Sequence, residues 1–204
     1  SIELKKITMG IWNYIKNSGE FPAENLTLEW VGNLPGKRES RRFTGEYTLT
    51  QNDLEENRKF DDAVCYGGWY MDFHPSGGIY SDEEFCTQIP VYAYDIPLRS
   101  FYQRNVTNLI FAGRNISTSH AAFSSTRIMD TCGSVGQVSG ETAAYCAKHK
   151  IRTSELGQIQ HVKNIQQQLL KNDLSAFGVK NQDDCDLAAI AEITAGGYRM
   201  TGED

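Results

Sequence analysis

The sequence lacks the features that define several classes of protein. No apolar run approaches the roughly 18 residues that a membrane-spanning helix needs, so a membrane partner is not expected. Lysine and arginine form no sustained stripe, and the net charge is −6, so nucleic acid is not expected either. The first residues show no charged segment followed by an apolar one, so no targeting segment is recognised and the compartment stays open.

The cysteines form no recognised metal-binding or disulfide pattern. There are five, widely spread, with no C-x-x-C pair and no Cys/His cluster at zinc spacing. An odd count favours thiols over a framework of disulfides. The sequence therefore predicts no metal site.

What is present is an ordinary globular composition, 40% hydrophobic and 23% charged, in a chain long enough to bury a core. Apolar spacing predicts a helix over residues 4–15 and a half-buried strand over 43–49. A helix is expected to start at Asn52, and a further strand is expected over 89–94. Gly67-Gly68, inside an aromatic stretch, predicts a bulge or a close backbone approach.

Residues 105–149 carry the sharpest pattern. The apolar run 109–112 predicts a strand buried on both faces and paired in parallel, and a helix is expected over 131–148. On that helix Gly136 and Gly140 share a face with several alanines, which predicts close packing against a strand or a ligand. Another amphipathic helix is expected over 154–171.

This region is also a candidate ligand site. Gly113 follows the expected strand and would let a ligand approach the backbone. Backbone N–H groups near residues 131–134 would face an anion or an electron-rich ring edge. The alternative is a buried crossover whose glycines serve packing alone.

Three other groups of side chains could carry chemistry. The cationic run 36–42, which includes Arg41 and Arg42, suits a carboxylate, a phosphate or an acidic partner, or is a solvated charge run. His74 and His120 are each either a general acid/base or a hydrogen-bonded structural histidine.

Several segments resemble, in the same order, the FAD-dependent oxidoreductase family in the form found in Bacteroidetes and related bacteria. They are PGKRESRRFTGEYTLTQNDL, DDAVCYGGWYMDFHP, IPLRS and NLIFAGRNISTSHAAFSSTRIMDTCGSVGQVSGETAA. Family members open with a strand, a G-x-G-x-x-G loop and a helix, and this sequence contains no such loop. The resemblance therefore implies the C-terminal, truncated portion of a bacterial flavoprotein whose N-terminal Rossmann segment is missing.

The resemblance also assigns residues to roles. Gly113 and Arg114 would lie near the ribityl and phosphate region of FAD. Backbone N–H groups at the start of the following helix would meet the pyrimidine edge of the flavin; these belong to Thr131, Cys132, Gly133 and Ser134. Catalytic or substrate-contacting roles fall to His74, Arg41, Arg42 and His120.

The expected fold class is α+β, a fragment of an α/β FAD-binding fold with a substrate-domain β-sheet. The expected parts are an N-terminal helical segment (1–35), a substrate-domain-like β region (36–104), the last strand and helix of the FAD-binding fold (105–150), a packing helix (151–178) and a linker or truncated domain (179–204).

The expected function is flavin-mediated hydride or electron transfer on an unidentified small molecule, with this chain alone inactive and its FAD binding weak or absent. One alternative is a non-catalytic interaction domain that keeps the scaffold without the cofactor. Another is a module that recognises polyanions or carbohydrates through the cationic run.

Overall fold

The computed structural model describes residues 2–172 and 174. The chain divides into two compact units, one ending at Ser40 and the other beginning at Arg41. The finer division into five parts stays a prediction, and the expected linker at 179–204 lies outside the described residues.

The first unit contains the predicted N-terminal helix. Helix α1 spans Ile2–Asn17, and none of its residues is buried. Polar contacts hold the segment after the helix, since the Lys16 ammonium donates to the carbonyls of Ala23, Glu24 and Leu26, each at 2.8 Å. Up to Ser40 the described chain forms no further helix or strand.

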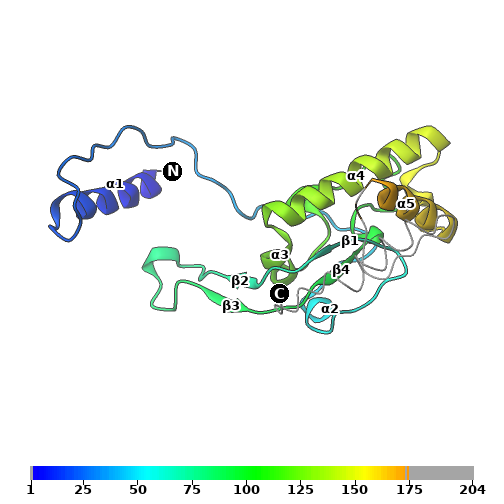
Figure 1. The fold of residues 1–204 in the computed structure, drawn as a ribbon, viewed down its shortest axis with the longest axis horizontal. Coiled ribbons are helices and arrows are strands. Elements are labelled where there is room, and N and C mark those ends of the chain that lie inside the picture. The colour runs from blue at the N-terminus through cyan, green and yellow to red at the C-terminus, as the bar shows by residue number, and fades with distance from the viewer. Residues whose placement is uncertain (1, 173, 175–204) are drawn as a thin grey trace. The chain divides into compact units, whose positions relative to one another are not determined.

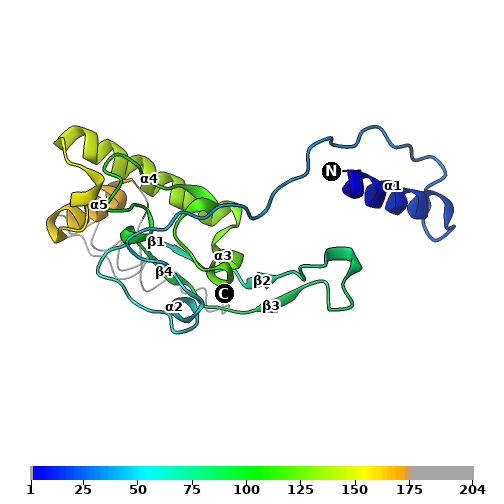
Figure 2. The ribbon, with the colours of Figure 1, turned by 180° about the vertical axis from the view of Figure 1, so that it is seen from behind.

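The described part of the second unit contains two short antiparallel strand pairs and four α-helices, so the predicted α+β class is confirmed (Figures 1 and 2). Strand β1 (Ala63–Gly67) pairs with β4 (Tyr94–Pro97), and β2 (Met71–Phe73) pairs with β3 (Thr87–Ile89). The helices are α2 (Gln51–Glu55), α3 (His120–Thr126), α4 (Met129–His149) and α5 (Ile159–Lys171). No helix among the described residues has the length and apolarity needed to cross a bilayer.

The core lies where α4 and α5 pack on β1. Val135 and Val138 of α4 are fully buried there, as is Ile165 of α5. The spacing of apolar residues predicts both helices correctly. Helix α5 begins five residues later than expected because Thr153–Glu155 forms a separate 3₁₀ turn.

The strand predicted over 109–112 is wrong. Only Ile110 forms a bridge, and it is antiparallel, to Tyr102. Of the four side chains only that of Phe111 is buried, while Leu109 is 40% exposed. A continuous apolar run does not make a strand here, because no strand in the described part of the chain supplies it with a ladder of hydrogen bonds.

Two other predicted strands are also wrong. Residues 43–49 bend at residues 46 and 47 and form only isolated contacts, such as the bridge from Leu49 to Thr118. The stretch 89–94 falls mostly between β3 and β4. Helix α2 is capped two residues earlier than expected, at Thr50, whose N–H and hydroxyl both donate to the Asp53 carboxylate at 2.8 Å.

The glycines divide into two kinds. Gly67 fulfils the predicted close approach, because a Cβ there would lie 2.6 Å from Cζ of the Tyr94 ring. Gly136 and Gly140 do not, because a Cβ at either would meet no described atom within 4 Å. The predicted close packing of the small face of α4 is therefore wrong, and the helix packs through its valines instead.

Candidate functional site

The β2–β3 hairpin gathers a cluster of chemically active side chains on one face. Asp72 is opposite Gln88 in the register, and extending that register by one residue puts Cys86 opposite His74. Because side chains alternate along a strand, Asp72 and His74 share a face while the Phe73 side chain points to the other. The sequence D-F-H and the sequence C-T-Q thus meet across the two strands.

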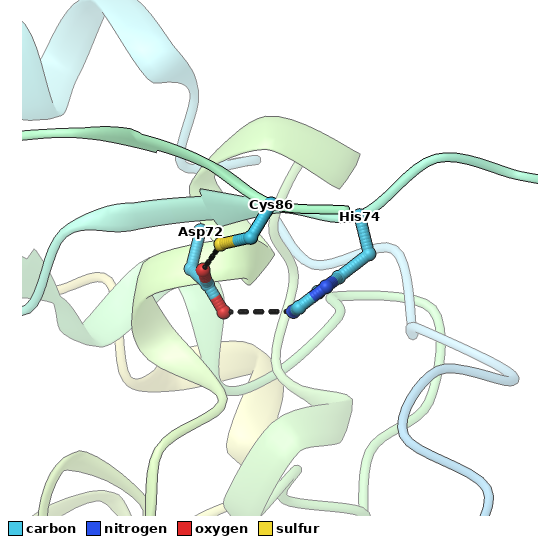
Figure 3. Close-up of side chains that lie close together, drawn as sticks. All are labelled: Asp72, His74 and Cys86. Atoms are coloured by element: carbon cyan, nitrogen blue, oxygen red, sulfur yellow. Dashed lines mark hydrogen bonds and ion pairs between the residues drawn. The ribbon is translucent and has the colours of Figure 1, made fainter. Parts of the chain in front are cut away.

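Asp72 is the centre of this cluster, as Figure 3 shows. One carboxylate oxygen, Oδ1, accepts from the Cys86 thiol at 2.7 Å and from the Gln88 amide at 3.3 Å. The other, Oδ2, lies 3.0 Å from Nε2 of His74. We call Asp72, His74 and Cys86 the hairpin cluster.

Arg127 connects the hairpin cluster to the helices. It follows the last residue of α3 and donates to Oδ2 of Asp72 at 2.7 Å. Partial burial of Asp72 raises the pKa of its carboxyl, but hydrogen bonds from Cys86, Gln88 and His74 outweigh burial and lower the pKa to about 2. Asp72 is therefore a carboxylate at neutral pH.

Both ring nitrogens of His74 face acceptors. Nδ1 lies 3.0 Å from the backbone carbonyl of Phe85, and Nε2 faces the Asp72 carboxylate. A neutral imidazole carries one N–H and can donate to only one of these acceptors. A neutral His74 therefore leaves one of these two contacts without a hydrogen, and a cation bound at that nitrogen would satisfy it.

Arg127 is followed directly by the start of α4, where the predicted flavin contacts lie. The N-cap Ile128 provides no side-chain hydrogen bond to the helix. The amide of Cys132 donates to the carbonyl of Ile128 at 2.9 Å, and the amides of Gly133 and Ser134 follow within the helix by the same pattern. The amides without a partner within the helix are therefore those of Met129, Asp130 and Thr131, and of the predicted four only Thr131 is among them.

Gly113 and Arg114 lie beside the beginning of α4. They belong to the 3₁₀ turn Gly113–Asn115, which contacts α4. Gly113 has a φ of +58°, a conformation that favours glycine, and a Cβ there would meet no described atom within 4 Å. Burial raises the pKa of the Cys132 thiol, and the positive charge of Arg114 acts in the opposite direction. The structure thus brings this turn and the first turns of α4 together.

The three remaining predicted residues lie either beside the Gly113 turn or at α3. The backbone carbonyl of exposed Arg41 accepts from the Asn115 side-chain amide at 2.7 Å, which holds Arg41 beside the Gly113 turn. Arg42 lies over the ring of Phe123 on α3, 5.7 Å from its centroid. His120 is exposed at the first residue of α3 and contacts the ring of Phe73, with 6.3 Å between the centroids.

Sequence reasoning found His74 but missed Asp72, Cys86 and Arg127. The i, i+2 spacing of Asp72 and His74 in a strand was the available signal, since it places both side chains on one face. Cys86 and Arg127 gave no comparable signal, because tertiary contacts bring them to Asp72 from 14 and 55 residues away.

An α+β domain with a polar cluster on a hairpin, joined through Arg127 to the residues before a long helix, is compatible with many activities. Comparison with known proteins narrows the class. The family model described as FAD dependent oxidoreductase matches residues 2–169. The chain belongs to this family, as the resemblance of its motifs predicted. Neither the curated proteins nor the solved structures gave a match.

Proposed function

We propose that this chain is the C-terminal portion of a bacterial, Bacteroidetes-type FAD-dependent oxidoreductase, and that it supplies the flavin-ring side and the substrate side of the active site. The family match over residues 2–169 carries the proposal. The FAD pyrophosphate would be held by an N-terminal Rossmann segment outside this chain. Alone, the chain is then inactive and binds FAD weakly.

The residues around the start of α4 fit one half of FAD. The amides of residues 129–131 have no partner within the helix, Gly113 leaves open space at its α-carbon, and Arg114 adds positive charge. Such groups stabilise negative charge on a reduced flavin ring or on a phosphate. A consecutive strand, glycine-rich loop and helix is the arrangement that holds a pyrophosphate. The described residues contain no such arrangement.

FAD, when bound, supplies hydride or electron transfer. This chain's residues would bind the substrate and move its protons. His74, fixed between Asp72 and the Phe85 carbonyl, would hold or release a proton at Nε2. Arg41 and Arg42 would bind an anionic group of a small-molecule substrate, and exposed His120 would be a further proton-transferring group.

Comparing FAD with riboflavin tests this proposal. If the chain contacts only the ring side of the cofactor, both flavins should bind weakly, as followed by quenching of flavin fluorescence. Their dissociation constants should agree within about threefold, because the ADP half of FAD would find no partner. Arg114→Ala should weaken binding of both flavins. Arg104→Ala is the matched control, since that side chain is 70% exposed and pairs with Glu46.

Two results would count against the proposal. Tight stoichiometric FAD binding with much weaker riboflavin binding would mean that the chain holds its own pyrophosphate site. Binding of neither flavin at millimolar concentration would favour the non-catalytic interaction domain.

A further inference from the structure

We propose that Asp72, His74 and Cys86 form a three-ligand site for a divalent transition-metal ion, of which Zn²⁺ is the best-matched representative. The three side chains offer a carboxylate oxygen, an imidazole nitrogen and a thiol sulfur, all within 4.8 Å of one another. Residue spacing predicted no metal site, because the ligands come from two strands of a hairpin and not from a compact motif.

The spacing of the ligand atoms suits a small tetrahedral ion. Zinc–ligand bonds of roughly 2.0–2.3 Å put neighbouring ligand atoms about 3.5 Å apart. In the hairpin cluster, Sγ of Cys86 is 2.7 Å from Oδ1 of Asp72, and Nε2 of His74 is 3.0 Å from Oδ2. A small widening of these contacts would admit the ion.

The set of donors selects the class of metal. One thiolate, one imidazole and one carboxylate form a mixed site of borderline softness, which favours Zn²⁺ and similar ions over Mg²⁺ or Ca²⁺. Three protein ligands leave a fourth position open for water or a substrate atom. The site is therefore of the kind that can accept an exogenous ligand.

The groups around the cluster already provide the outer contacts that metal sites use. Metal-bound histidines commonly donate their other ring N–H to a backbone carbonyl, and Nδ1 of His74 faces that of Phe85. Bound carboxylates are in turn hydrogen-bonded, and Arg127 and Gln88 both donate to Asp72. Arg127 also adds a positive charge, which offsets part of the negative charge of a carboxylate and a thiolate.

A metal ion would take the place of the hydrogens in these contacts. The Cys86 thiol donates its hydrogen to Asp72, and Nε2 of His74 lies 3.0 Å from the same carboxylate. On metal binding the thiol proton, and the Nε2 proton where present, pass to solvent. While the ion is bound, Nε2 cannot transfer a proton, so metal binding and the proposed acid/base role of His74 exclude each other.

Titration with Zn²⁺ against a chromophoric chelator tests the site without any flavin, so its outcome is independent of the proposed function. One equivalent should bind. His74→Gln and Cys86→Ser should each weaken binding by more than the roughly 10–100-fold that loss of an outer contact costs. His149→Gln and Cys146→Ser, both on α4, are the matched controls, and both should bind as the unchanged chain does.

Cobalt gives a second measurement, made on the unchanged chain. Co²⁺ bound by Cys86 should show a near-ultraviolet thiolate-to-cobalt charge-transfer band, and Cys86→Ser should abolish it while Cys146→Ser keeps it. If Cys86→Ser fails to fold, judged by circular dichroism, the band in the unchanged chain and its loss in His74→Gln decide instead. Absence of stoichiometric binding, or binding that the ligand substitutions leave unchanged, would overturn the proposal.

Discussion

Replacing Gly67 with alanine tests whether the end of β1 is shaped by the Tyr94 ring. A Cβ at residue 67 would lie 2.6 Å from Cζ and 2.9 Å from Cε2 of Tyr94. The ring cannot move aside easily, because it is fully buried and its hydroxyl is 2.7 Å from the Ser125 hydroxyl. The added methyl group must therefore displace either the ring or the strand.

The expected loss of stability is large for one methyl group. Overpacking of a core costs about 1–3 kcal/mol. Displacing Tyr94 from Ser125 adds about 0.5–1.5 kcal/mol for the lost hydrogen bond. We therefore expect the free energy of unfolding to fall by about 2–4 kcal/mol, and Tm to fall by about 2–4 °C for each kcal/mol in a chain of this size.

Urea denaturation of Gly67→Ala and Gly68→Ala provides the matched comparison. At residue 68 the nearest described atom to a new Cβ is Cα of Ala93, at 3.6 Å, which is an ordinary contact. That variant should change stability by no more than about 0.5 kcal/mol. Equal stability of the two variants would refute the close approach and, with it, the position of Tyr94 against β1.

Two further predictions concern stability. Gly140→Ala should stabilise the chain by about 0.5–1 kcal/mol in urea denaturation, because the new methyl group meets no described atom and alanine is the better helix former. A destabilised variant would show that something covers this face of α4. Burial, followed by the nearby Asp62 and Glu46, raises the pKa of Tyr102 to about 12. The unfolded chain releases this proton at lower pH, so stability should also fall as pH rises from about 10 towards 12. Tyr102→Phe should flatten this alkaline slope in melts at stepped pH, and an unchanged slope would contradict the assignment.

Long helices could be predicted from the sequence because their signal is local. Helix α5 shows its apolar stripe in residues Val162, Ile165 and Leu169, and the structure buries all three. Helix α1 was predicted equally well, although none of its apolar side chains is buried. Periodicity thus predicts that a helix forms but not what its apolar face contacts.

Strands were predicted poorly because pairing depends on distant partners. The run 109–112 resembles a buried strand, yet Phe111 is buried by stacking on Phe43, with 4.8 Å between the ring centroids, and not by a sheet. The actual β2 has only three residues, too few for a period-2 pattern to be distinctive. Its identity as a strand depends on β3, 14 residues further along the chain, which no local pattern reveals.

The hairpin cluster shows where sequence reasoning about function stops. The motif D-F-H, part of one segment that resembles the family, indicated His74 as a catalytic candidate. The chemistry of His74, however, depends on which groups face its two ring nitrogens. Those partners are the carbonyl of Phe85 and the carboxylate of Asp72, and the carboxylate is in turn bound by Cys86 and Arg127. An isolated histidine could serve as an acid or a base. A histidine with acceptors at both nitrogens and a thiol beside its carboxylate can also bind a metal ion, so titration with Zn²⁺ and Co²⁺ decides which chemistry this family member has available.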